Sequence, residues 1–165
     1  MKNIVFVLSD MQFDNKNFVD IEATVKNQIE LINFCRLENY PFILSEYKHR
    51  AKTVPFLVQS LKSLKKNKFF FIDKSLNSQL EEKRINTLLQ GLSTKTVVLM
   101  GANACACILG LSINLLNQNY EIVISKDTIT GYCSFHAENE IDKWYKENTI
   151  FFDNYNQVID YIKKT

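Results

Sequence analysis

The 165-residue sequence predicts an α/β fold, a three-layer α/β/α sandwich around a mainly parallel sheet of six strands. Six short runs rich in β-branched and aromatic residues alternate with longer amphipathic stretches. One amphipathic stretch follows each run, a pattern typical of right-handed βαβ crossovers. The chain is also 46% hydrophobic and 12% aromatic, enough for one sizeable core. We therefore interpret residues 1–165 as a single domain.

The elements follow in chain order from this alternation of patterns. Each strand is assigned on its apolar run: Asn3–Leu8, Pro41–Ser45, Lys68–Ile72, Thr96–Met100, Glu121–Ser125 and Thr149–Phe152. Each helix is assigned on the amphipathic stretch after a strand: Ile21–Asn39, Val54–Lys66, Gln79–Gln90, Ala106–Asn117, Phe135–Glu147 and Tyr155–Lys164. The stretch 106–117 is apolar nearly all round, so we expect burial against the sheet or a second subunit.

The charge pattern does not indicate nucleic acid or a membrane as a partner. The 20 basic and 18 acidic residues are mixed along the chain, and the formal charge is +2. The one basic run, Lys62 to Lys68, is typical of a solvated helix end. No cleavable leader or membrane-length apolar stretch is visible, so a soluble, cytoplasmic protein is expected. The four cysteines lack the spacing of a disulfide framework or a four-ligand metal site.

Three chemically active residues follow predicted strands. Asp10 follows the first strand, Lys74 the third, and Cys107 comes just after the fourth, where a helix begins. In an open parallel sheet, ligands bind at the carboxyl ends of the strands. The positive end of a helix also favours thiolate over thiol, so Cys107 is a candidate nucleophile.

Dinucleotide binding is disfavoured at the same edge. A Rossmann domain needs a Gly-x-Gly-x-x-Gly turn after the first strand, but Ser9-Asp10-Met11-Gln12-Phe13 contains no glycine. The segment from Gly101 to Gly110 also lacks the Lys-Ser/Thr of a phosphate loop.

Several segments together resemble the isochorismatase-like cysteine hydrolase superfamily, in particular its short, uncharacterised branch. The matching segments, in order, are Val7–Gln12, Phe70–Ser78, Val97–Cys107 and Tyr120–Asp127, with a softer match at 44–55. The resemblance implies a sheet order of 3-2-1-4-5-6 and a catalytic triad of Asp10, Lys74 and Cys107. It also implies a non-proline cis peptide at Ala102–Asn103 and an oxyanion hole formed by the backbone N–H groups of Asn103 and Cys107.

The resemblance implies a hydrolase that cleaves a small amide or related C–N bond through a thioester. No cofactor or metal is expected, because the ligand histidines of the nicotinamidase branch are missing. The vinyl-ether hydrolysis of true isochorismatases is also disfavoured, because those enzymes lack the cysteine. The predicted partners are a small-molecule substrate and further copies of the chain in a dimer or larger homo-oligomer. The predicted substrate-binding residues are Gln12, Phe13, Glu46, Tyr47 and Leu76.

Each residue also has a structural interpretation. Taken alone, Asp10 is more typical of a turn or N-cap, Lys74 of a solvated side chain, and Cys107 of a small buried hydrophobe. Their coincidence on one edge of the sheet, in the order of the family, favours function. The alternative function is a non-catalytic binding or scaffolding protein on the same fold. A redox pair of Cys105 and Cys107 is a further alternative, disfavoured because a Cys-x-Cys bridge distorts a helix start.

Overall fold

A parallel sheet forms the centre of the protein in the computed structural model, which describes residues 3–12, 21–48, 52–74, 78–132 and 135–165. The strands are β1 (Ile4–Ser9), β2 (Phe42–Glu46), β3 (Phe69–Asp73), β4 (Thr96–Ala102), β5 (Glu121–Ser125), β6 (Ile129–Thr130) and β7 (Ile150–Phe152). Their order is β3-β2-β1-β4-β5-β7, and β6 pairs with the end of β4. This confirms the predicted fold class and order, with β7 in the place of the sixth predicted strand.

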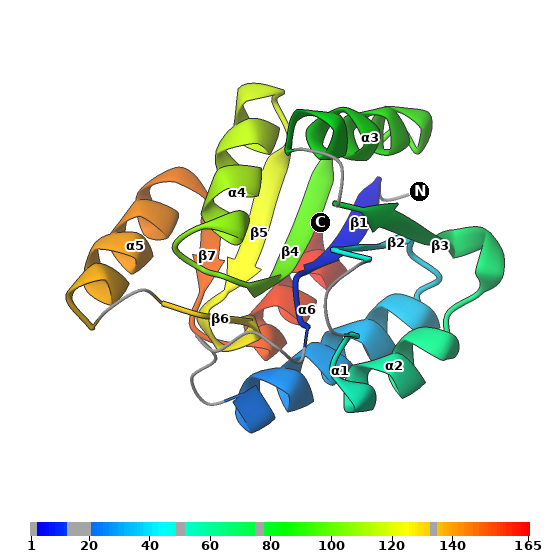
Figure 1. Cartoon of the computed structure of the whole chain (residues 1–165), viewed down its shortest axis with the longest axis horizontal. Coiled ribbons are helices and arrows are strands. Elements are labelled where there is room, and N and C mark those ends of the chain that lie inside the picture. Colours follow the sequence, from blue (N-terminus) through cyan, green and yellow to red (C-terminus); the bar gives the residue numbers. More distant parts are fainter. Residues whose placement is uncertain (1–2, 13–20, 49–51, 75–77, 133–134) are drawn as a thin grey trace.

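Helices cover both faces of the sheet (Figure 1). The described helices are α1 (Ile21–Leu37), α2 (Pro55–Lys62), α3 (Ser78–Gly91), α4 (Cys107–Asn117), α5 (Phe135–Asn148) and α6 (Tyr155–Lys164), with short 3-10 turns η1 (Lys66–Lys68) and η2 (Lys126–Thr128). One layer holds α1, α2 and α6, and the other holds α3, α4 and α5.

The core consists of two apolar clusters, one on each face of the sheet. Phe6 and Leu8 of β1 belong to the first cluster, and Val5 and Val7 belong to the second. All four side chains are at most 1% exposed. Strand β1 is therefore buried on both faces, as expected for a central parallel strand.

Apart from shifts of one or two residues at the ends of elements, two details differ from the predicted elements. Strand β6 was not predicted, because two residues are too few to carry a periodic pattern. The predicted helix 54–66 ends at Lys62, where the Ser63 hydroxyl donates to the Ser60 carbonyl at 2.6 Å. Such side-chain bonds compete with helix continuation, and a separate turn, η1, follows. No helix in the described ranges is long and apolar enough to cross a membrane.

Candidate active site

Asp10 lies at the carboxyl end of β1, where the strand stops. Its φ of 55° lies in the left-handed region, which Asp and Asn adopt more readily than most residues. Its N–H donates to the Ser45 carbonyl of β2 at 3.0 Å. The residue is 6% exposed, so this turn buries a carboxylate at the edge of the sheet.

Lys74 reaches Asp10 from the other side of β2. Its N–H donates to the Glu46 carbonyl at 3.0 Å, which continues the pairing of β3 with β2. Its Nζ lies 2.6 Å from Asp10 Oδ2 and 5.2 Å from the centre of the Tyr47 ring. The two charged side chains are only 5% and 8% exposed. Lys74 is therefore a buried partner of Asp10 and not a solvated side chain.

Gly101 allows β4 to approach β1 closely at this edge. It is in register with Ser9 and has a φ of 131°. A Cβ atom added here would lie 2.0 Å from the Ser9 carbonyl oxygen, which no real side chain tolerates. Glycine at position 101 therefore permits the turn that leads from β4 toward Cys107.

The segment between β4 and α4 has an unusual backbone that several contacts hold in place. The Ala102–Asn103 peptide bond is cis, at the position implied by the family resemblance. The Asn103 carbonyl accepts from the Ala106 and Ile108 N–H groups at 3.0 and 3.1 Å. The Ala104 N–H donates to Thr130 of β6 at 2.8 Å, and the buried Tyr145 hydroxyl donates to the Ala104 carbonyl at 2.6 Å.

Cys107 is the first residue of α4, and its thiol is free. Burial raises the pKa of this thiol, the nearby Lys74 ammonium lowers the pKa, and the charge and hydrogen bonding of Asp10 raise it. A hydrogen bond from the Asn103 backbone to the sulfur lowers the thiol pKa further. The net direction is upward, so the expected preference for thiolate at the helix start is wrong for the free protein. A raised pKa keeps the proton on the sulfur beside a carboxylate that can accept it.

The two carboxylate oxygens of Asp10 differ in their contacts. Asp10 Oδ2 is held by Lys74, whereas Oδ1 is buried and accepts no well-formed hydrogen bond from any described residue. The arrangement thus supplies a proton acceptor, a fixed positive charge and a thiol within one cluster. The structure brings Asp10, Lys74, Cys107 and the Asn103 backbone together, as the sequence analysis predicted.

A pocket of about 280 Å³ opens over Cys107. Its polar lining consists of Tyr47, Lys74, Glu82 and Cys107, and its apolar lining of Ala106, Gly110 and Leu111. Glu82 comes from α3, where it accepts from the Asn114 side chain of α4 at 2.8 Å. The sequence analysis missed Glu82, because no motif marks it and its position depends on how α3 packs against α4.

The predicted substrate-binding residues fall into three groups. Tyr47 lines the pocket over Cys107. Gln12 is 3% exposed and forms hydrogen bonds with both backbone polar groups of Tyr47, at 2.8 and 3.0 Å. Glu46 lines a neighbouring pocket of about 530 Å³ and accepts a hydrogen bond from Thr53. Phe13 and Leu76 lie outside the described residues. Substrate contact by all five stays a prediction.

The remaining cysteines differ from expectation in one respect. Cys105 takes part in a disulfide bond, whereas the sequence analysis expected no disulfide. Because the Cys107 thiol is free, the alternative of a Cys105–Cys107 redox pair is wrong for this structure. Cys35 is fully buried, and burial strongly raises the pKa of its thiol. No group of three or more His, Cys, Asp or Glu in the described part of the chain is arranged to hold a metal ion.

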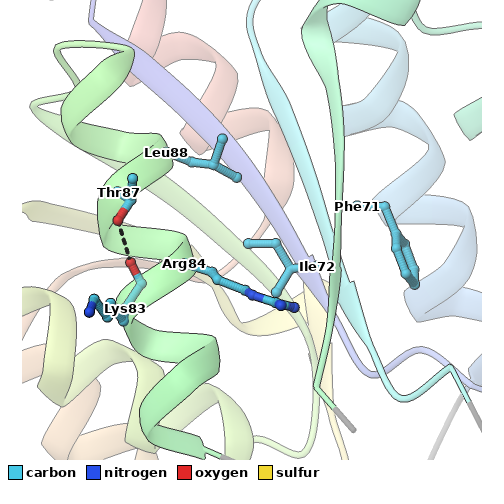
Figure 2. Close-up of a pocket in the computed structure, with 6 residues that line it drawn as sticks. All are labelled: Phe71, Ile72, Lys83, Arg84, Thr87 and Leu88. Carbon is cyan, nitrogen blue, oxygen red and sulfur yellow. Dashed lines mark hydrogen bonds between the residues drawn. The ribbon is translucent and has the colours of Figure 1, made fainter. Parts of the chain in front are cut away.

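A separate pocket of about 440 Å³ lies between α3 and β3 (Figure 2). Its lining consists of Phe71, Ile72, Lys83, Arg84, Thr87 and Leu88. Figure 2 shows Arg84 extending from α3 toward Ile72 of β3. The two positive charges that directly follow Glu82 in the sequence therefore belong to a different pocket from the one over Cys107.

The chain belongs to the isochorismatase family, because the isochorismatase domain model matches residues 4–150. Isochorismatase domain-containing protein 2 of Danio rerio is 30% identical over 134 residues, which cover 79% of this chain and 64% of that protein. GTPase Obg of Mesomycoplasma hyopneumoniae (strain 232) is 28% identical over 97 residues, which cover 59% of this chain. The chain matches only 22% of the length of that GTPase.

Solved structures share the fold at lower identity. An isochorismatase family protein from Desulfovibrio vulgaris has a TM-score of 0.79 at 15% identity, covering 99% of this chain and 100% of that one. The MAR1 ribonuclease of Caenorhabditis elegans has a TM-score of 0.77 at 20% identity, covering 96% and 80%. The nicotinamidase SaPncA from Staphylococcus aureus has a TM-score of 0.75 at 15% identity, covering 93% and 100%. At these identities the solved structures show a shared fold.

Proposed function

We propose that the protein is a cysteine-dependent hydrolase of small amides or related C–N bonds, with Asp10, Lys74 and Cys107 as its catalytic triad. The observation that carries the proposal is the carboxylate of Asp10, which Lys74 fixes at 2.6 Å through one oxygen while the other oxygen is buried without a well-formed hydrogen bond. Asp10 lies near enough to the Cys107 thiol to raise its pKa through charge and hydrogen bonding. A nucleophile, a base and a group that orients the base are thus adjacent.

In the first half-reaction, Asp10 takes the thiol proton as the sulfur attacks the substrate carbonyl carbon. The negative charge that develops on the carbonyl oxygen is stabilised by the backbone N–H groups of Asn103 and Cys107. The proton on Asp10 then passes to the leaving nitrogen as the C–N bond breaks. An amine leaves, and the acyl group remains on Cys107 as a thioester.

In the second half-reaction, Asp10 takes a proton from water, and the oxygen attacks the thioester carbonyl. The C–S bond breaks, the thiolate recovers its proton from Asp10, and a carboxylic acid leaves. The charge of Lys74 opposes the effect of burial, because it favours the thiolate over the thiol.

Ammonia release from a panel of small amides and ureido compounds tests the proposal. The wild type and Cys107→Ala are compared, and mass spectrometry of quenched reactions locates the acyl adduct. We expect release by the wild type alone, with the adduct on Cys107. A folded wild type that releases no ammonia and forms no adduct with any compound would favour the alternative, a non-catalytic binding protein.

We also propose that the protein is a homo-oligomer. Helix α4 supports this, because Ile113 is 42% exposed while Leu109 and Leu116 are only partly buried. A second copy that covers this face would remove apolar surface from water. Light scattering during size-exclusion chromatography measures the mass directly, and a monomer at high concentration would contradict this proposal.

A further inference from the structure

The pocket over Cys107 contains a negative charge that the triad does not use. Glu82 belongs to α3 and lines the same pocket as Cys107 of α4. Its carboxylate accepts a hydrogen bond from the neutral side-chain amide of Asn114, at 2.8 Å. None of the ion pairs among the described residues includes Glu82.

The other charges at the pocket compensate one another. Lys74 is the pocket's basic side chain among the described residues, and it is paired with Asp10 at 2.6 Å. Lys83 and Arg84 line the separate pocket of Figure 2 and are not part of the lining over Cys107. The described lining therefore carries one uncompensated negative charge, located on Glu82.

The pocket lining also combines a positive helix end with a carboxylate. The N-terminus of α4 presents N–H groups and the positive end of the helix dipole, and no acidic residue lies in its first turn. Glu82 of α3 presents a carboxylate to the same pocket. A substrate that fits both groups places its carbonyl oxygen at α4 and a positive or N–H-rich group at Glu82.

We infer that the substrate carries a cationic or N–H-donating group next to its scissile bond, and that Glu82 selects it. This inference rests on the proposed function, because the carbonyl end of the substrate is placed by Cys107. A substrate with a carboxylate at the same position would face repulsion from Glu82. An amide or ureido compound with an ammonium or guanidinium group is favoured over its acidic counterpart.

Charged thiol reagents test this without knowledge of the substrate. Cys107 of the folded protein is treated with neutral iodoacetamide, with cationic 2-aminoethyl methanethiosulfonate and with anionic 2-sulfonatoethyl methanethiosulfonate. Mass spectrometry follows modification at Cys107 alone. The ratio of the cationic to the anionic rate does not depend on the thiol pKa, because both reagents require the same thiolate.

Glu82→Gln removes the charge but retains an oxygen that can accept from Asn114. Glu140→Gln is the matched control, since it changes the net charge equally at an exposed position outside the pocket. At low salt we expect the wild-type ratio to fall about fivefold in Glu82→Gln and to stay unchanged in Glu140→Gln. At about 1 M salt the difference between the two variants should shrink.

The outcomes separate the inference from the proposed function. A ratio that Glu82→Gln leaves unchanged, with Cys107 still reacting with iodoacetamide, would overturn the role of Glu82 alone. A Cys107 that is inert to all three reagents in the folded protein, together with no ammonia release, would overturn the proposed function. Equal falls in Glu82→Gln and Glu140→Gln would assign the effect to net charge and also overturn the inference.

Discussion

Lys74 Nζ lies 2.6 Å from Asp10 Oδ2, although the two residues are 64 positions apart and strand β2 runs between them. Both side chains are buried, so each charge depends on the other for compensation. The pair leaves one oxygen of Asp10 for Cys107 and sets the charge around the thiol. The predictions below concern this pair, the cysteine it serves and the backbone that positions them.

Replacement of the two cysteines near the start of α4 should have opposite consequences. Cys107→Ala should abolish hydrolysis and leave stability within about 1 kcal/mol, because it removes the nucleophile and little else. Cys105→Ala should retain most activity but lose a disulfide, which typically costs 2–4 kcal/mol. Steady-state rates and thermal unfolding of the oxidised protein check both. Equal losses of activity would contradict the assignment of Cys107.

Asp10→Asn should lower the rate by roughly two orders of magnitude or more, because an amide cannot accept the proton that general base catalysis requires. Asn tolerates the φ of 55°, so the backbone turn should persist. The sequence alone suggested little effect on stability, but the buried Lys74 ammonium would lose its counter-charge. We therefore expect a loss of about 3 kcal/mol in the free energy of unfolding. A folded variant with a near wild-type rate would return Asp10 to a structural role.

The pH dependence of Cys107 alkylation should shift in opposite directions in two variants. The Lys74 charge lowers the thiol pKa, so Lys74→Gln should move the rate profile with iodoacetamide to higher pH. Asp10 raises the same pKa, so Asp10→Asn should move the profile to lower pH. Lys83→Gln, which removes an equal charge from the separate pocket of Figure 2, is the control and should leave the profile in place. Shifts of the same sign in the first two variants would refute this account of the site's charges.

Gly101→Ala should destabilise the protein by at least about 3 kcal/mol or prevent folding, because the new methyl group would collide with the Ser9 carbonyl oxygen. Gly91→Ala is the matched control, since no heavy atom lies within 4 Å of a Cβ there. In the control, helix propensity should keep stability within about 1 kcal/mol of the wild type. Urea unfolding of both variants measures the difference, and equal midpoints would be inconsistent with a close approach of β4 to β1.

Tyr145→Phe should weaken the support of the segment before Cys107. The variant leaves the buried Ala104 carbonyl without its donor, which costs about 1–3 kcal/mol. The kcat should fall more than the KM changes, because the proposed oxyanion donors, the N–H groups of Asn103 and Cys107, belong to the same backbone segment as Ala104. Tyr161→Phe removes a hydroxyl that contacts Glu121 at an exposed position, and it should have little effect on stability or kcat. A Tyr145→Phe variant with wild-type kcat would restrict Tyr145 to a structural role.

The strand assignments predicted that Asp10, Lys74 and Cys107 lie at one edge of the sheet, because each follows a strand and the carboxyl ends of parallel strands meet there. The strand order that makes them neighbours, and their interpretation as a triad, came from the family resemblance. Glu82 and Tyr145 could not be predicted in this way, because each reaches the site from within a helix. Their positions depend on helix packing that no local pattern records.

The direction of the Cys107 pKa shift was also beyond the sequence. A helix start is visible in the pattern, and its dipole favours a charged thiolate by about 1 kcal/mol or less. Burial of a charge costs several kcal/mol, and burial is a property of the packed fold. Burial thus outweighs the helix dipole, and the degree of burial of Cys107 could not be read from the sequence.

The buried Lys74–Asp10 pair also depends on the correct register of strands β1, β2 and β3. Neighbouring strands lie about 4.8 Å apart, so the Lys74 and Asp10 side chains together bridge roughly two strand spacings from β3 to β1. A slip of β3 by one residue would turn Lys74 to the opposite face of the sheet and leave Asp10 without its counter-charge. Only the native alignment, with Glu46 opposite Asp73 and Ser9 opposite Ser45, neutralises both groups. The contact between Lys74 and Asp10 thus penalises a one-residue slip of β3.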